Sequence, residues 1–210
     1  MTHEEELTCI RQVLSGDRNA FEKLVDDNQT RVYNIALRML GNEDDALDAA
    51  QETFLRAYAS LQSFRGESRF STWICRLASN QCIDFLRARG RRINVVSLTS
   101  ADPEEETGFQ EIEIPDERFS PGNVLEKKEL REALSRGLQE LPEEYRRILV
   151  LRELGGLSYE ELEAELRLEA GTVKSRLSRA RKKLCAFLCG EGNLSNASPS
   201  KKTKGGVERE

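Results

Sequence analysis

The side chains of this sequence that could take part in chemistry are mostly charged, and the two signs of charge are segregated. Five acidic residues and no basic residue lie within 43–52, whereas basic residues gather at 87–92 and 174–183. Such segregation predicts different partners for the acidic and the basic surfaces. The formal net charge of -5 argues against tight binding to free DNA, because counterion release rewards cationic proteins. The basic blocks nevertheless supply groups that can bind phosphates and guanine edges.

Side chains for covalent catalysis or metal binding are scarce in this chain. His3 is the single histidine, which argues strongly against a Ser-His-Asp triad or a histidine-dependent metal site. The sequence also contains no glycine-rich phosphate loop and no nucleophile with an adjacent base. We therefore expect a protein that is not an enzyme and that binds no metal or cofactor.

The cysteines are odd in number, and the start of the chain shows no export signal, so we expect reduced thiols rather than disulfides. Cys185 and Cys189 are one helical turn apart, a spacing that fits a metal site or a redox switch. Without further ligands nearby, we expect both to pack as small apolar residues. The five cysteines are Cys9, Cys75, Cys82, Cys185 and Cys189.

Apolar residues recur at three- and four-residue steps in the first half of the chain, which predicts amphipathic helices. One helix is expected over 21–40, ended by Gly41, and a second over 44–61, with Tyr58 on its buried face. Ser71 is the expected N-cap of a third helix, which should end in the basic segment around Gly90. These helices would form a first small domain.

The second half of the chain has the pattern of a helix-turn-helix. Pro142 fits the first turn of one helix, and Ser158 with Glu161 forms a capping box for a short helix to about Leu166. A last helix should bury Val173 and its neighbours and expose basic and hydroxyl side chains. We therefore predict an all-α fold with two small helical domains at 1–92 and 123–190, joined by a flexible acidic linker at 93–122 and followed by a disordered tail at 191–210.

No run of apolar residues approaches the roughly 18 to 20 that a membrane-spanning helix needs. The start MTHEEELTCI lacks both the basic flank and the apolar centre of a signal peptide. We therefore expect a cytoplasmic protein.

Three segments of the chain follow one another across the acidic linker: DDALDAAQETFLRAY, FRGESRFSTWICRLASNQCIDFLRARGRR and LSYEELEAELRLEAGTVKSRLSRARKKL. In this order they resemble an extracytoplasmic-function sigma factor of the sigma-70 family. The resemblance implies that the first domain, region 2, binds core RNA polymerase and recognises the minus-10 promoter element. It also implies that the second domain, region 4, recognises the minus-35 element, so that the chain directs transcription initiation and promotes DNA melting.

The resemblance assigns polymerase binding to a coiled coil of the largest subunit, with the flap of the second subunit as a further contact. An outward leucine among carboxylates suits a basic partner with an apolar spot. A merely solvated acidic face is the alternative. The matched positions in this sequence are Leu47, Asp48, Gln51 and Glu52.

DNA contacts are assigned to two sets of residues. Capture of a flipped base in single-stranded DNA needs stacking surfaces, amides, hydroxyls and cations, and the minus-10 positions are Phe64, Ser68, Arg69, Arg76, Asn80 and Arg87. Trp73 has the right chemistry but lies on the apolar helical face, so we expect it in the core. The minus-35 positions are Lys174, Ser175, Arg176, Ser178 and Arg179, whereas the basic side chains at 181–183 are expected only to solubilise the helix end.

The helix-turn-helix departs from the family pattern at Glu163, Glu165 and Arg167, which replace a small residue, an apolar residue and the turn glycine or its usual substitutes. These changes bear on the strength and sequence preference of minus-35 binding and not on the architecture, and the sequence does not fix the direction of their effect. The family resemblance also implies an anti-sigma protein as a partner. The main alternative function is a stand-alone helix-turn-helix regulator, which would bind duplex DNA without polymerase.

Overall fold

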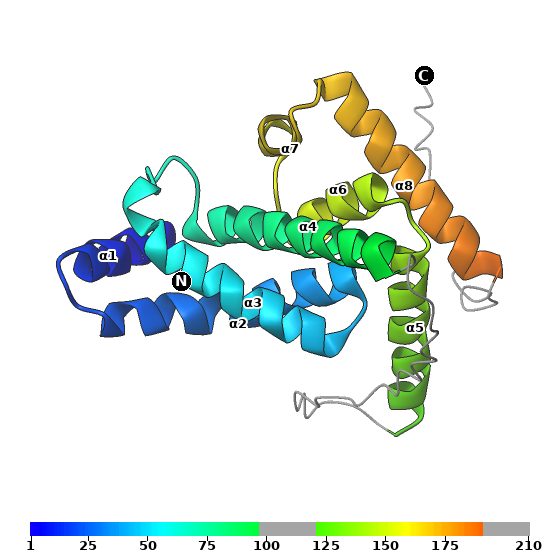
Figure 1. The fold of residues 1–210 in the computed structure, drawn as a ribbon, viewed down its shortest axis with the longest axis horizontal. Helices are drawn as coiled ribbons and strands as arrows, with labels where there is room; N and C mark the ends of the chain where they lie inside the picture. The colour runs from blue at the N-terminus through cyan, green and yellow to red at the C-terminus, as the bar shows by residue number, and fades with distance from the viewer. Residues whose placement is uncertain (97–120, 191–210) are drawn as a thin grey trace, which may run out of the picture.

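The computed structural model describes residues 1–96 and 121–190, and every regular element within these ranges is helical (Figure 1). The prediction of an all-α fold is therefore confirmed. The predicted linker and tail lie outside the described residues, except that helices extend into both ends of 93–122. The elements are α1 (His3–Leu14), α2 (Asn19–Leu40), α3 (Glu43–Ala59), the 3-10 helix η1 (Leu61–Ser63), α4 (Phe70–Val96), α5 (Pro121–Gln139), α6 (Glu143–Glu153), α7 (Tyr159–Leu166) and α8 (Ala170–Gly190).

Helices α2, α3 and α4 pack against one another, and α1 packs mainly on α2. Gly41 ends α2 in the left-handed conformation, with φ of 75°, and the Asn42 side chain then accepts the backbone N–H of Asp45 to cap α3. Large apolar side chains such as Leu24, Ile35 and Met39 are fully buried between these helices. Sequence periodicity did not predict α1, whose buried apolar residues are few.

The second unit is built around α8, which packs on α5, α6 and α7. Ser158 and Glu161 form the predicted capping box at the start of α7. Arg167 ends α7 in the left-handed conformation, with φ of 52°. Val173 and Leu177 are buried under α7 and α6 as predicted, so this unit has the helix-turn-helix architecture.

Two predicted boundaries of the third helix are wrong. The helix begins at Phe70, so Ser71 lies inside its first turn and is buried instead of serving as the N-cap. At the other end α4 continues through Gly90 to Val96. Glycine inside a helix costs only about 1 kcal/mol relative to alanine, and the arginine, leucine and alanine residues before it are strong helix formers.

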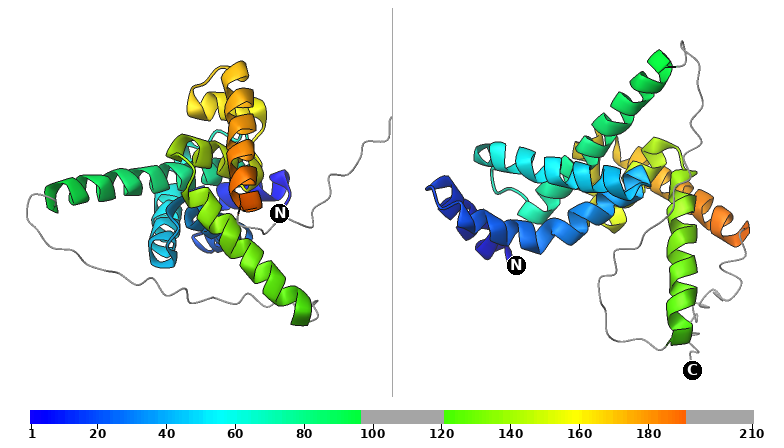
Figure 2. Two further views of the ribbon diagram at one scale, coloured as in Figure 1. Left: turned by 90° about the vertical axis from the view of Figure 1, so that its right-hand side faces the viewer. Right: turned by 60° about the horizontal axis from the view of Figure 1, so that its bottom comes forward.

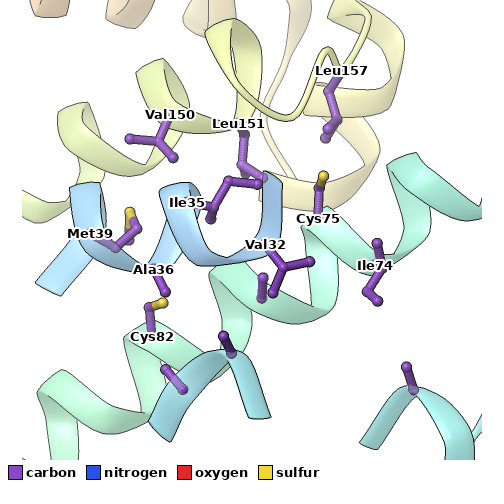
Figure 3. Close-up of a cluster of buried hydrophobic side chains, with 14 of the residues drawn as sticks. Val32, Ile35, Ala36, Met39, Ile74, Cys75, Cys82, Val150, Leu151 and Leu157 are labelled. Atoms are coloured by element: carbon purple, nitrogen blue, oxygen red, sulfur yellow. The ribbon is translucent and has the colours of Figure 1, made fainter. Parts of the chain in front are cut away.

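The two units share an apolar interface. Figure 3 shows Val150 and Leu151 of α6, with Leu157 of the following turn, pointing toward α2 and α4, where Ile35 and Cys75 lie. Two polar contacts flank this interface: Arg146 donates to the carbonyl of Met39 over 2.6 Å, and Gln139 donates to the carbonyl of Arg38 over 3.1 Å. Figure 2 shows the free ends of α4 and α5 extending from the packed units in different directions.

Candidate polymerase and nucleic-acid interfaces

The predicted polymerase-binding residues lie together on the outer face of α3. Leu47 is 39% exposed, and Asp48 and Gln51 are also exposed. Glu52 is half-exposed and accepts a hydrogen bond from Arg56 Nε over 3.0 Å. The face therefore combines an apolar side chain with carboxylates, as a basic partner with an apolar contact point requires.

The same face continues along α3 beyond the predicted residues. Leu55 is 66% exposed and Tyr58 is 42% exposed, and their positions follow Leu47 and Gln51 at helical spacing. Sequence analysis expected Tyr58 in the core, and that expectation was wrong: its ring packs edge-on against Phe21 at 5.1 Å and otherwise faces outward. The recurrence of apolar residues on the outward face was the signal that could have identified Leu55.

The loop before α4 carries three of the predicted minus-10 residues. Phe64 is half-buried, with its ring centre 5.2 Å from that of Trp73. Trp73 packs at 5.6 Å against Phe70, which is fully buried, so the expected core role of Trp73 holds in part. Ser68 is half-buried, and the exposed Arg69 donates to the carbonyl of Met1 over 2.6 Å.

Glu6 of α1 lies at the start of α4, and sequence analysis missed it. Its side chain is fully buried, and its Oε2 accepts the backbone N–H of Phe70 over 3.0 Å. Arg69 Nη2 lies 3.6 Å from the other carboxylate oxygen, and His3 Nδ1 lies 3.5 Å from Oε2. Because Glu6 is far from α4 in sequence, no local pattern could reveal this contact.

Two of the three predicted minus-10 residues on α4, Arg76 and Asn80, contact α7 of the other unit. Arg76 forms ion pairs with Glu161 at 3.2 Å and with Glu165 at 4.0 Å. Asn80 donates to Glu165 Oε1 over 3.1 Å. Arg87 is exposed on the same helix. The structure thus brings Arg76 and Asn80 together, but against protein carboxylates.

Arg147 of α6 completes this polar cluster. It donates to Asn80 Oδ1 over 2.5 Å, to Ser79 Oγ over 3.0 Å and to Glu165 Oε1 over 3.1 Å. Burial lowers the pKa of the Arg147 guanidinium, and the Glu165 carboxylate opposes part of that effect. An arginine pKa begins so high that the group stays charged, so the cluster is an ionic contact between the units.

The predicted minus-35 face of α8 is open. Lys174, Ser178 and Arg179 are exposed. Ser175 is half-buried and donates to the carbonyl of Thr172 over 3.0 Å, and Arg176 forms an ion pair with Glu144 at 3.0 Å. These side chains stand on the N-terminal half of the second helix of the helix-turn-helix, the part that enters the major groove in this motif.

Both units match family models of known proteins. Residues 24–92 match Sigma-70 region 2, and residues 131–184 match Sigma-70, region 4. The chain is 39% identical to the ECF RNA polymerase sigma-E factor of Escherichia coli (strain K12) over 180 residues, which are 84% of this chain and 92% of that protein. It is 36% identical to the RNA polymerase sigma-H factor of Pseudomonas aeruginosa over 184 residues, 86% of this chain and 92% of that protein. The chain belongs to the extracytoplasmic-function group of the sigma-70 family.

Solved structures share the fold of this sigma factor. CnrH in complex with the cytosolic domain of CnrY has a TM-score of 0.60 at 24% identity, and the match covers 89% of this chain and 99% of that one. The sigma factor RpoE in complex with the anti-sigma factor NepR from Bartonella quintana also has a TM-score of 0.60 at 24% identity, over 80% of this chain and 96% of that one.

Family membership establishes the function that the resemblance implied. This sigma factor binds core RNA polymerase, recognises the minus-35 and minus-10 promoter elements and promotes DNA melting. Sigma factors are in general non-catalytic initiation factors. Family membership therefore favours the sigma factor over the stand-alone regulator.

The cysteines of this sigma factor divide into two kinds. Cys9, Cys75 and Cys82 are buried, and burial raises the pKa of Cys75 and of Cys82 to about 12. Cys185 and Cys189 are exposed on α8 with their Sγ atoms 3.9 Å apart, so the prediction that both pack as apolar residues is wrong.

Within residues 1–96 and 121–190, none of the helices has the length and the apolar composition of a membrane span.

Proposed function

We propose that this sigma factor divides its work among three faces, one for polymerase and two for promoter DNA. The observation that carries this assignment is the segregation of charge on the folded chain. The acidic face of α3 lies in the unit that matches region 2, and a separate basic face is present in each unit, on α4 and on α8.

The α3 face would dock on a coiled coil of the largest polymerase subunit. Leu47 supplies an apolar contact at the centre, and Asp48, Gln51 and Glu52 supply polar groups around it. Charges at such an interface speed encounter and fix orientation more than they raise affinity. The exposure of Leu47 and Asp48 supports this role, because neither side chain must be uncovered before binding. A flap of the second subunit is the further proposed contact.

The loop from Phe64 to Phe70 and the outer face of α4 would take the melted non-template strand. An extruded base needs an aromatic surface and polar groups for its edge, and Phe64, Ser68 and Asn80 provide these types. Arg69, Arg76 and Arg87 would contact phosphates, as cations do in single-strand grooves.

The α8 face would read the minus-35 duplex from the major groove. Lys174 and Arg179 can reach guanine acceptors or phosphates, and Ser178 can bond either. Ser175 and Arg176 already have partners within the protein, so we assign them to the edge of the contact.

We also propose domain boundaries at 1–92 and 123–190, a cytoplasmic location and no enzymatic activity. We further propose control by an anti-sigma protein, in keeping with the solved structure of RpoE with NepR.

One reconstitution tests this function. Purified chain is added to core polymerase on a library of promoters, and the transcripts are sequenced. We expect specific initiation only when both components are present, and only weak binding of the free chain to promoter duplex in an electrophoretic shift at physiological salt. Tight, sequence-specific binding by the free chain together with no polymerase-dependent transcript would show instead a stand-alone regulator.

A further inference from the structure

The buried carboxylate of Glu6 stands at the first turn of α4, where the backbone N–H groups lack helical partners. It accepts the N–H of Phe70, and its charge is favourable at the positive end of the helix. Its Oε1 makes no hydrogen bond and lies 3.6 Å from Arg69 Nη2, and His3 Nδ1 lies 3.5 Å from its Oε2. A buried carboxylate charge is costly unless it is paired. A movement of the loop that broke the contacts with Phe70 and Arg69 would incur this cost, so the Glu6 carboxylate favours the loop conformation seen here.

The N-terminal segment, Met1 with helix α1, touches the same loop at two further points. Arg69 donates to the carbonyl of Met1 over 2.6 Å. Gly66 has φ of 73°, and a Cβ atom there would lie 3.2 Å from a methyl carbon of Leu7. The loop that precedes α4 is therefore held against α1 by a hydrogen bond, a close approach and the Glu6 carboxylate.

We propose that Glu6 is a positioning residue for minus-10 recognition. It holds the loop from Phe64 to Phe70 in one conformation before a DNA strand arrives, which reduces the ordering cost of binding. The proposal rests on the minus-10 role of that loop. Glu6 itself contacts no DNA and acts through Phe70 and Arg69.

The test compares Glu6→Gln and Glu6→Ala with Glu4→Gln, a change at an exposed position of the same helix. Glutamine keeps an acceptor for the Phe70 N–H and removes the charge, so it should fold even if alanine does not. The probe is a non-template oligonucleotide from the best promoter of the reconstitution, with 2-aminopurine in the minus-10 element, added to holoenzyme made from the full chain. Affinity for core polymerase and for minus-35 duplex is measured on the same samples.

We expect Glu6→Ala to weaken capture of the single strand by about tenfold, Glu6→Gln to lie between alanine and wild type, and Glu4→Gln to match wild type. Core and minus-35 affinities should not change. Equal capture by wild type and both Glu6 variants would overturn the proposal, and so would a parallel loss in all three measurements. If the wild-type holoenzyme captures no single strand, the proposed function of the loop has failed instead.

A second, independent observation concerns the contact between the units. Arg76 and Asn80, two residues proposed to bind the minus-10 strand, are held by Glu161 and Glu165 of α7. The two carboxylates form ion pairs with Arg76, and Glu165 also accepts a hydrogen bond from Asn80, so both proposed DNA contacts already have partners within the protein.

The contact is partly desolvated, which strengthens it. The side chains of Glu165, Arg147 and Arg76 are 15%, 19% and 23% exposed. In the apolar part of the interface, Leu157 points toward Cys75, the neighbour of Arg76 in the sequence (Figure 3). Movement of α7 away from α4 would remove both carboxylates from Arg76 and Asn80 at once.

We propose that Glu165, with Glu161, is an autoinhibitory contact: α7 and the promoter strand compete for Arg76 and Asn80. The free chain is closed, and opening of the two units exposes the α4 face. This inference also rests on the minus-10 role of Arg76 and Asn80.

The test uses Glu165→Gln with Glu163→Gln as the matched control, since both remove one charge from the same helix. The free full-length chain is titrated with the same single-stranded oligonucleotide, and alkylation of Cys75 and Cys82 is followed by peptide mass spectrometry. Both thiols are buried with pKa values raised to about 12, but only Cys75 points toward Leu157 of the other unit (Figure 3). Cys82 is thus an internal control for unfolding.

We expect Glu165→Gln to raise oligonucleotide affinity about tenfold and to speed alkylation of Cys75 but not of Cys82. Glu163→Gln should behave as wild type. Unchanged affinity and unchanged Cys75 alkylation in Glu165→Gln would overturn the proposal, as would an equal gain in Glu163→Gln. If Arg76→Ala holoenzyme captures the minus-10 strand as well as wild type, the assigned function of this face is wrong, whatever the state of the contact.

Discussion

The outer faces of α3 and α4 belong to one helical bundle but differ in what opposes them. On α3, Leu47 and Asp48 face solvent. On α4, Arg76 and Asn80 are held by carboxylates from α7. In the unit that matches region 2, the face proposed to bind polymerase is thus open, whereas two residues proposed to bind the minus-10 strand are engaged by α7. The difference suggests an order of events, in which polymerase docks first and DNA follows once the units separate.

The comparison also explains how a chain of net charge -5 can serve DNA recognition. Counterion release gives a free acidic protein little affinity for duplex DNA, and Arg76 on the α4 face is already paired with Glu161 and Glu165. Both features keep the unbound protein off DNA. Specific binding then depends on a complex in which polymerase holds both units in place.

The largest effect is expected from reversing charge on the open face. The double variant Asp48→Lys with Glu52→Lys should lose association with core polymerase, because like charges across an interface cost several kcal/mol. Co-purification with core polymerase is the measurement. A variant with Glu4→Lys and Glu129→Lys carries the same change in net charge at exposed sites elsewhere and should associate normally. Normal association and transcription by the α3 variant would remove the docking assignment.

The next largest effect is expected from breaking the ion pair between Arg147 and Glu165 at the contact between the two units. Arg147→Met should destabilise the protein by about 2 to 3 kcal/mol, because it leaves the Glu165 carboxylate partly buried without its main cation. Arg181→Met removes an ion pair to Glu153 between half-exposed side chains and should cost less than about 1 kcal/mol. Urea unfolding followed by circular dichroism compares the two. Equal losses of unfolding free energy in the two variants would mean that the Arg147–Glu165 pair is as exposed to solvent as the Arg181–Glu153 pair.

The open face of α8 should respond to mutation in a different way. Arg179→Ala should leave polymerase association intact and weaken holoenzyme binding to promoters by about 1 to 3 kcal/mol if the arginine reads a base. If it contacts only phosphate, the loss should be similar on all sequences and the salt dependence should become shallower. Transcription from wild-type and minus-35-altered promoters separates the two cases. No loss on any promoter would exclude Arg179 from the contact.

Features with a local signal could be predicted from the sequence. Gly41 and the Ser158 capping box marked helix ends correctly, and the helix-turn-helix followed from apolar spacing and basic composition. The missed features join distant residues: Glu6 and Phe70 are 64 positions apart, and Asn80 and Glu165 are 85 apart. No periodicity in one segment reports a carboxylate that caps another helix. Tyr58 was misplaced for a related reason, because helical spacing identifies a face but not what covers it.

The smallest expected effect lies at the turn that sets the direction of α7. Arg167 ends that helix with φ of 52° and ψ of 51°, a conformation that costs a residue with a Cβ atom about 1 kcal/mol. Glycine relieves this cost but adds freedom to the unfolded chain, so Arg167→Gly should stabilise the protein by no more than about 0.5 kcal/mol. Arg167→Asn should gain a similar amount, since asparagine tolerates the left-handed region.

Arg167→Ala is the control for this turn, because alanine has the same backbone preference as arginine and should leave the urea midpoint unchanged. The backbone N–H of Arg167 donates to the carbonyl of Glu163, and all three substitutions keep it, so minus-35 binding by the holoenzyme should stay within about twofold of wild type. A clear loss of stability in both Arg167→Gly and Arg167→Ala would show that the arginine side chain itself stabilises the turn. In that case the position of α7, and with it the contact of Glu165 on α4, would depend on more than the backbone of the turn.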